Sequence, residues 1–184
     1  MERLKESLRD APVVDRGDYQ YFVHPVTDGL PAVDADLLRE VARAIADATD
    51  LSSVDKVIAP EAMGIHHATA LTLETGVPFV VARKREYGFD GEVAVHQETG
   101  YGEGELYVNN VEAGDRVVIV DDVLSTGGTL EAVCQAVESI GAELVDVVVV
   151  LRRVGEDVPD FPVEPTALVT VDVVDGEVVI VDDE

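Results

Sequence analysis

Hydrophobic and polar positions along the chain follow two patterns, one typical of amphipathic helices and one typical of buried strands. Apolar residues recur at three- and four-residue spacing between residues 37 and 48, just after Asp34, a residue type that caps helix N-termini. Short, almost wholly apolar runs occupy residues 56–59, 78–82, 116–120 and 145–151. Runs of this kind are typical of parallel strands that are covered on both faces.

Helical patterns follow two of these runs, and each ends at a glycine. One begins at Ile65 and ends before Gly76, and the other ends before Gly141, where a glycine cap terminates many helices. Near the C-terminus, Asp175-Gly176 separates two apolar runs and predicts a two-residue β-hairpin. Strands that alternate with helices predict an α/β fold, with a twisted, mainly parallel sheet and helices on both faces.

The stretch from 86 to 110 differs from the rest because it is rich in glycine and tyrosine, and only residues 105–108 resemble a strand. Long glycine-punctuated connections inside compact domains are typical of functional lids. We therefore expect a lid in this part of the chain.

Composition limits the classes of protein that fit. The 184 residues, 47% of them hydrophobic, suit one domain spanning 1–184. The 38 acidic and 13 basic residues give a net charge of −25, which makes duplex nucleic acid a poor partner. A uniformly anionic surface repels itself in dilute buffer but is screened at high salt. The charge favours a protein of a very saline cytoplasm, such as that of a halophilic archaeon, over an ordinary acidic protein.

The expected cellular location of the protein is based on membrane spans, signal segments and cysteines. No apolar run reaches the ~20 residues of a membrane span, and the first six residues contain no apolar signal core. Cys134 is the only cysteine and lies on the apolar side of a predicted helix, so we expect a buried core residue rather than a nucleophile. These features predict a cytoplasmic protein with no membrane partner.

The segment 117–129 carries the clearest chemical signal. A buried strand is followed by Asp121 and Asp122, then by Ser125-Thr126-Gly127-Gly128-Thr129, then by a helix. In open α/β sheets, ligands bind at the carboxyl ends of the strands. Glycine amides, hydroxyl groups and a helix N-terminus together suit a phosphate. The two carboxylates suit vicinal hydroxyls or a hydrated Mg²⁺, so the segment predicts a ribose 5-phosphate site.

The carboxylate pair is informative only because it lies between a buried strand and the Ser-Thr-Gly-Gly-Thr turn. By itself it would mean little, because a chain this acidic contains several adjacent acidic pairs by chance. Neither the Gly-Lys-Ser/Thr ending of a nucleotide-kinase loop nor the G-x-G-x-x-G pattern of dinucleotide-binding proteins is present. Both of those classes are therefore excluded.

The segment 120–129, Val-Asp-Asp-Val-Leu-Ser-Thr-Gly-Gly-Thr, resembles the phosphoribosyl-pyrophosphate (PRPP) signature of type I phosphoribosyltransferases. Blocks at 22–28, 60–64, 83–85 and 100–106 follow in the order seen in adenine phosphoribosyltransferases, and the archaeal hypoxanthine/guanine group is the nearest likeness. The resemblance implies the type I phosphoribosyltransferase fold with a flexible hood loop over 86–107. It also implies a homodimer that uses Mg²⁺ and PRPP to convert a purine base into a nucleoside monophosphate and pyrophosphate.

The resemblance also implies roles for individual residues. Asp121, Asp122 and Lys84 would be catalytic, and the two aspartates would hold the ribose hydroxyls and, through water, Mg²⁺. The PRPP site would comprise Asp121, Asp122, Val123, Leu124, Ser125, Thr126, Gly127, Gly128 and Thr129. Pyrophosphate would lie on Ala62, Met63, Gly64, Arg83 and Lys84, and Phe22 would stack on the purine base.

The basic cluster Arg83-Lys84-Arg85 supports this independently of any likeness. It is the densest group of cations in a chain with only three lysines, which favours a bound anion over a surface patch of ion pairs. The histidines carry less information. His66-His67 favours packing over metal binding, whereas His24 and His96 suit either base binding or simple exposure.

Some positions depart from the family pattern. Met63 stands where adenine enzymes carry an arginine, Gly100 replaces a glutamate and Tyr87 replaces a hood lysine. Ser125 stands where classical hypoxanthine-guanine enzymes carry an acid. Together these changes count more against adenine than against a 6-oxopurine. The alternative is a PRPP- or nucleotide-binding regulator that kept the phosphate cradle and lost catalysis.

Overall fold

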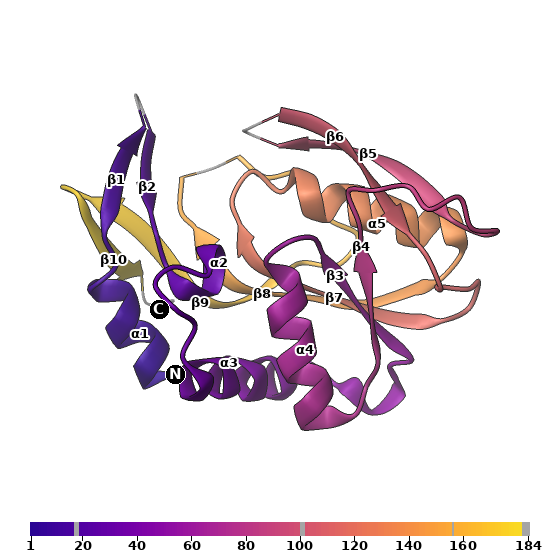
Figure 1. Ribbon diagram of the computed structural model, residues 1–184, viewed down its shortest axis with the longest axis horizontal. Coiled ribbons are helices and arrows are strands. Elements are labelled where there is room, and N and C mark those ends of the chain that lie inside the picture. Colours follow the sequence, from indigo (N-terminus) through magenta and orange to yellow (C-terminus); the bar gives the residue numbers. More distant parts are fainter. Residues whose placement is uncertain (17–18, 100–101, 156, 182–184) are drawn as a thin grey trace.

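A six-stranded sheet runs through the centre of the computed structural model, which describes residues 1–16, 19–99, 102–155 and 157–181 (Figure 1). Across the sheet the strands are β10 (Glu177–Val181), β9 (Thr166–Val174), β8 (Glu143–Arg153), β7 (Arg116–Leu124), β3 (Lys56–Pro60) and β4 (Phe79–Ala82). All neighbours are parallel except β10, which pairs antiparallel with β9. The expected mainly parallel α/β sheet is confirmed.

Helices cover both faces of this sheet, as predicted. Helices α1 (Glu2–Arg9), α3 (Ala35–Ala48) and α4 (Gly64–Thr75) lie on one face, and α5 (Gly128–Ile140) lies on the other (Figure 1). Strand β7 explains why both faces are apolar. Val118 and Val120 pack with the first group of helices, whereas Val117 and Ile119 pack with α5.

Capping residues fix the helix ends at the predicted places. Asp34 caps α3 because its carboxylate accepts hydrogen bonds from the amides of Asp36 and Leu37. Helices α4 and α5 end at Gly76 and Gly141, both in the left-handed conformation. The turn between β9 and β10 also follows the prediction, because Asp175 and Gly176 both have positive φ.

The stretch predicted as a lid contains more strand than expected. Residues of β5 (Val93–Thr99) and β6 (Gly102–Val108) form an antiparallel hairpin that lies over α5 (Figure 1). Only the second half of β6 had been expected as a strand, so the hood over 86–107 is not simply a loop. Gly100 and Tyr101, which belong to the hood motif, lie outside the described residues.

Strand β7 also continues beyond its predicted end at Val120, through both aspartates to Leu124. The reason is pairing with β8, which itself extends to Arg153, so that Asp121 lies opposite Val149 and Leu124 opposite Arg152. The carboxylates are therefore held by a strand rather than by a turn.

Smaller elements complete the fold. Strands β1 (Val13–Arg16) and β2 (Tyr19–Phe22) form a hairpin near the β9–β10 edge, and the short helix α2 (Pro25–Asp28) follows it (Figure 1). A 3-10 turn, η1 (Leu51–Ser53), precedes β3. Among the residues described, no helix is both long and apolar enough to cross a membrane.

Candidate active site

A cavity of about 360 Å³ lies where β3, β4 and β7 end and α5 begins. It brings together segments that are distant in sequence but that share the carboxyl edge of the sheet. Its lining consists of Glu61, Ala62, Met63, Lys84, Gln97, Asp121, Asp122, Val123, Ser125, Thr126, Gly127, Gly128, Thr129 and Leu130. Most residues predicted for PRPP and pyrophosphate therefore surround one space.

The turn between β7 and α5 forms one wall of the cavity. Gly127 caps α5 with a φ of 82°, a left-handed conformation that favours glycine. A methyl group added at Gly127 would lie 2.8 Å from Pro159 Cδ and 3.0 Å from Phe161 Cζ, so the segment after β8 packs directly on this turn. Both constraints hold the helix N-terminus, with its free amides, at the cavity.

The two aspartates lie at the floor of the cavity and are almost buried, with exposed fractions of 5% for Asp121 and 9% for Asp122. Asp121 Oδ1 accepts a hydrogen bond of 2.9 Å from the amide of Asp122. Burial raises the pKa of Asp121 to about 6, opposed by hydrogen bonds from Asp122 and by the charge of Lys84. Burial and the neighbouring Asp121 raise the pKa of Asp122 well above its usual range.

Burial disfavours the charge of this pair, as the raised pKa values indicate, and two kinds of ligand would stabilise that charge. Hydroxyl groups can donate hydrogen bonds to both carboxylates, and a hydrated divalent cation can offset their charge. Within the described part of the chain, no three His, Cys, Asp or Glu side chains are grouped closely enough to hold a metal ion. The donor set fits a Mg²⁺ that is bound partly through water and partly through a ligand.

The segment after β3 also lines the cavity. Ala62 and Met63 line the cavity, and the peptide bond between Glu61 and Ala62 is cis. Gly64 lies behind them, and a methyl group there would stand 2.9 Å from Val120 O and 3.1 Å from Asp121 Oδ1. The start of α4 is therefore packed against the strand that carries the carboxylates.

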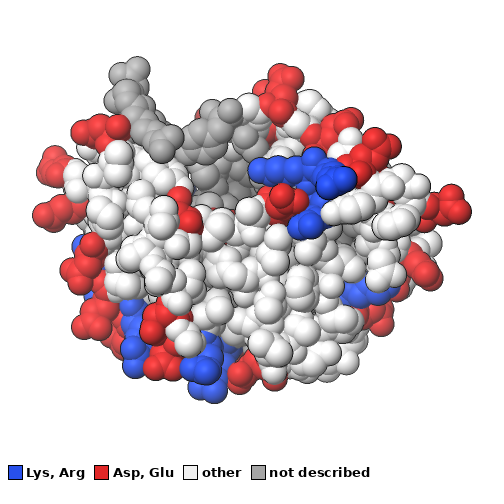
Figure 2. Space-filling view, viewed as in Figure 1, with Lys and Arg blue, Asp and Glu red and all other residues white. Residues whose placement is uncertain are grey.

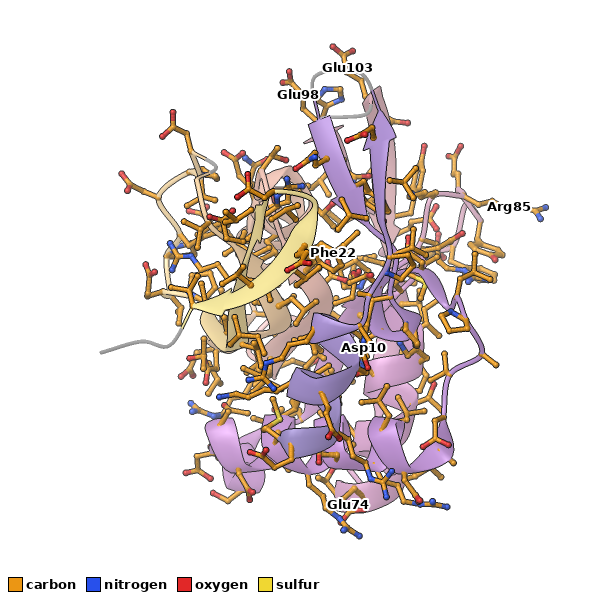
Figure 3. All side chains as sticks on the ribbon, turned by 90° about the vertical axis from the view of Figure 1, so that its left-hand side faces the viewer. Asp10, Phe22, Glu74, Arg85, Glu98 and Glu103 are labelled. Carbon is orange, nitrogen blue, oxygen red and sulfur yellow. The ribbon has the colours of Figure 1, made fainter. Side chains whose placement is uncertain are left out.

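The three consecutive cations after β4 point in different directions. Lys84 lines the cavity, whereas Arg83 lies 3.7 Å from the carboxylate of Glu61 and 3.4 Å from the hydroxyl of Tyr87. The guanidinium of Arg85 lies 5.6 Å from the Tyr87 ring centroid and projects away from the body of the protein (Figure 3). The two interpretations of this cluster, an anion site and a surface patch of ion pairs, each apply to part of it. Lys84 faces the cavity, and Arg83 forms a surface ion pair with Glu61.

Charge is unevenly distributed around this edge. Figure 2 shows Lys and Arg side chains gathered near the end of β4, on a face otherwise marked by scattered acidic residues. Glu61 helps to hold this corner, because its carboxylate also accepts a hydrogen bond from the amide of Lys84 at 3.3 Å.

Four residues predicted for the site do not line the cavity: Gly64 and Arg83, described above, and two residues of the hydrophobic core. Phe22 has an exposed fraction of 5% and belongs to the core beneath the sheet, near the centre of the molecule in Figure 3. Leu124 is 1% exposed and packs with α5. Their roles toward base and PRPP stay predictions.

The histidines mostly serve packing. His24 is 1% exposed and caps α2 by accepting a hydrogen bond from the amide of Val26. His67 is fully buried, with Nε2 2.9 Å from Val26 O, and its ring lies 3.8 Å from that of His66. Burial lowers the pKa of His24 to about 4 and that of His67 to about 3. Cys134 is buried in the core, as predicted.

Sequence reasoning missed Glu61, Gln97 and Leu130 as lining residues. Glu61 and Leu130 directly adjoin the predicted motifs, so a wider window around each motif would have included them. Gln97 lies on the hood strand β5, and its sequence Val-Ala-Val-His-Gln-Glu-Thr carried no pattern that would have singled Gln97 out.

Comparison with known proteins gives a consistent result. Residues 33–163 match the phosphoribosyl transferase domain family. The chain is 59% identical to "HGPRTase-like protein 3" of Haloterrigena turkmenica over 99% of this chain and 98% of that relative. It is 52% identical to the "HGPRTase-like protein" of Halobacterium salinarum over 100% of this chain and 98% of the relative. All of these relatives come from haloarchaea, as the charge of the chain had suggested.

Solved structures agree on the fold. The crystal structure of adenine phosphoribosyltransferase from Rhodothermus marinus superposes with a TM-score of 0.74 at 26% identity, covering 92% of this chain and 97% of that one. The expected type I phosphoribosyltransferase fold is confirmed.

Proposed function

The chain belongs to the phosphoribosyltransferase family, and we propose that within it the protein is a purine salvage enzyme. The reaction would transfer the phosphoribosyl group of PRPP to a purine base, giving a nucleoside monophosphate and pyrophosphate. One observation carries this proposal: two buried carboxylates and a glycine- and hydroxyl-rich helix N-terminus face the same cavity. A ribose with a phosphate at its 5′ position needs both kinds of group in one site.

Each wall of the cavity has a function in this proposal. The carboxylates of Asp121 and Asp122 would accept hydrogen bonds from the ribose hydroxyls and so orient C1′. The amides and hydroxyls of residues 125–129 would hold the 5′-phosphate. Ala62, Met63 and Gly64 would lie along the pyrophosphate, and the ammonium of Lys84 would offset the negative charge that develops as it leaves.

Water must be kept from C1′, because it competes with the purine as a nucleophile. The hairpin β5–β6, whose Gln97 already lines the cavity, would close over the bound substrates and exclude it. Mg²⁺, when bound with PRPP at Asp121 and Asp122, supplies charge neutralisation to the pyrophosphate. The chain itself needs to supply no covalent nucleophile.

We favour a 6-oxopurine over adenine as the base. The haloarchaeal relatives carry HGPRTase-like names, and Met63 lies where adenine enzymes carry an arginine. The second candidate is a PRPP- or nucleotide-binding regulator that kept the cradle without catalysis. The observation in its favour is the pairing of Arg83 with Glu61, which leaves Lys84 as the cation among the cavity-lining residues.

The remaining features of the proposal concern the assembly. We propose that residues 1–184 act as one domain, that the enzyme works as a homodimer in the cytoplasm, and that neither nucleic acid nor membrane is a partner. The net charge of −25 supports the last point for nucleic acid.

The test is a panel assay with labelled PRPP, Mg²⁺ and adenine, hypoxanthine, guanine or xanthine in molar KCl. We expect pyrophosphate release with at least one 6-oxopurine. The double variant Asp121→Asn with Asp122→Asn should lose turnover and keep its fold, whereas Asp10→Asn with Asp47→Asn removes two exposed charges and should change neither. Binding of PRPP without turnover for every base would favour the regulator, and full activity of the Asp121/Asp122 variant would contradict both.

A further inference from the structure

Among the side chains of hood strand β5 that the structure describes, residues 93–98, one polar side chain lies on the inward face. Val93 and Val95 point toward α5 and pack with the core there, while Ala94, His96 and Glu98 are exposed. The next inward position is Gln97, which has an exposed fraction of 7%. A strand that only covered an apolar helix would carry a third apolar residue at this position.

Gln97 makes a specific contact with the phosphate turn. Its side-chain Nε2 donates a hydrogen bond of 2.5 Å to Thr129 Oγ1, across 32 residues of sequence. Thr129 is in the first turn of α5 and lines the cavity together with Gln97. Burying an amide costs free energy unless it is hydrogen-bonded, so this contact is what makes a glutamine tolerable on the inner face.

The direction of this hydrogen bond has a consequence for Thr129. A hydroxyl group has one proton to donate and two lone pairs to accept with. Because the Gln97 amide occupies a lone pair, the proton of Thr129 is turned away from the hood and is free for a ligand in the cavity. A hydroxyl that accepts one hydrogen bond also becomes a stronger donor for the next.

We propose that Gln97 is a positioning residue, which directs the Thr129 proton toward the 5′-phosphate of PRPP and fastens the hood to the occupied phosphate site. The inference rests on the proposed function, because it takes a ribose 5-phosphate as the ligand of this turn. Coupling of this kind is reciprocal. The phosphate stabilises the docked hood, and the docked hood strengthens the grip on the phosphate.

Four variants separate this role from simple packing. Gln97→Leu fills similar space and removes the donor, and Thr129→Val removes the hydroxyl while Thr129→Ser keeps it. Gln97→Glu replaces the donor by a carboxylate that takes the Thr129 proton for itself. Glu98→Gln is the matched control, because Glu98 is on the same strand but points outward at the hood tip (Figure 3).

Binding measurements by calorimetry in molar KCl give the expected pattern. Gln97→Leu should weaken binding of PRPP and ribose 5-phosphate about tenfold and leave binding of pyrophosphate alone unchanged, while Glu98→Gln stays within twofold of the parent. Thr129→Ser, which keeps the hydroxyl, should bind both ligands more tightly than Thr129→Val. Gln97→Glu should be weaker than Gln97→Leu at pH 8. It should recover relative to the parent as the pH falls toward 5.5, because a protonated carboxyl can again donate.

Three results would overturn the inference. Equal losses for ribose 5-phosphate and pyrophosphate in Gln97→Leu would indicate a general structural effect. Parent-like binding by Gln97→Glu at pH 8 would mean that the hydrogen bond runs in the other direction. The proposal expects the Gln97→Leu, Thr129→Val double variant to bind ribose 5-phosphate as weakly as Thr129→Val alone. If the losses in binding of the two single variants instead add up in the double variant, the two side chains act independently.

A substrate-free measurement separates failure of this inference from failure of the proposed function. Amide hydrogen exchange of residues 93–99 in the free protein should speed up about tenfold in Gln97→Leu and not in Glu98→Gln. If the parent binds neither PRPP nor ribose 5-phosphate, the proposed function fails whatever the exchange shows. If the parent binds them but exchange is unchanged in Gln97→Leu, only the coupling through Gln97 is refuted.

Discussion

Gly64 offers the sharpest test of the site geometry, because it lies where helix α4 meets the strand that carries the carboxylates. A methyl group added there would be 2.9 Å from Val120 O and 3.1 Å from both Asp121 Oδ1 and Pro60 Cδ. Carbon atoms do not approach a carbonyl oxygen that closely, and Val120 is held in the centre of the sheet opposite Val148. The Asp121 carboxylate must therefore move, or the start of α4 must.

The size of the effect of Gly64→Ala follows from two opposing contributions. Overpacking of a filled site costs about 1–3 kcal/mol, and the better helix propensity of alanine returns up to about 1 kcal/mol. A net loss of about 1–2 kcal/mol lowers Tm by roughly 2–8 °C in a chain of this size. Displacement of Asp121 by a fraction of an ångström to 1 Å should lower kcat/KM on the order of 100-fold.

Gly76→Ala is the matched control, because Gly76 ends the same helix and has no neighbour within 4 Å of an added methyl group. Its φ of 80° makes alanine cost about 1–2 kcal/mol, a similar loss of stability far from the cavity. Thermal unfolding and steady-state kinetics in molar KCl should show equal destabilisation but loss of activity in Gly64→Ala alone. Parent-like kcat/KM in Gly64→Ala would refute the close packing of α4 against Asp121.

Three further predictions concern charge. Lys84→Met should lower kcat/KM for PRPP by about 10- to 100-fold, because the Lys84 side chain lines the cavity. Arg85→Met should stay within twofold of the parent, because the Arg85 side chain lies over Tyr87 instead. Equal effects of the two variants would contradict these different positions of the two side chains. Burial lowers the folded-state pKa of His24 to about 4 and of His67 to about 3, so the stability that these two histidines contribute above about pH 6.5 should fall by roughly 4 kcal/mol at pH 5. The raised pKa values of Asp121 and Asp122 act in the opposite direction, because their protonation stabilises the folded state as the pH falls. In urea titrations His67→Leu, which cannot titrate, should therefore lose about 2 kcal/mol less than the parent between pH 7 and pH 5, and an equal pH dependence would contradict the burial of His67. Transfer from 2 M to 0.1 M KCl should lower Tm, because the Debye length grows from ~2–3 Å to ~10 Å around a chain of charge −25; a Tm independent of KCl would contradict adaptation to salt.

The sequence was informative about this fold wherever one local pattern decided the structure. Helix caps at Asp34, Gly76 and Gly141 depend on single residues, and apolar runs such as 116–120 depend on burial of both faces of the sheet. The extension of β7 through Asp121 and Asp122 could not be predicted in this way. It depends on pairing with β8, and two adjacent carboxylates are poor strand formers by themselves.

In the site, too, features set by local sequence were predictable and features set by tertiary contacts were not. The glycine- and hydroxyl-rich turn was predictable because its residue types are those that a phosphate requires. The separate orientations of Arg83, Lys84 and Arg85 were not, since Glu61 and Tyr87 compete for two of these side chains. Gln97 was also unpredictable, because its partner Thr129 lies on another element and only tertiary packing brings them together.

The cavity must bind a strongly anionic substrate within an anionic protein, and its own side chains do not make it positive. Its lining includes the carboxylates of Glu61, Asp121 and Asp122 against the ammonium of Lys84. Attraction for phosphate must therefore come from oriented amides and hydroxyls at the start of α5 and from a cation that arrives with the substrate. In molar salt, where screening acts within ~3 Å, long-range attraction would contribute little in any case. Hydrogen bonds at contact distance survive such screening, which is why the precise aim of groups such as Thr129 matters more here than net charge does.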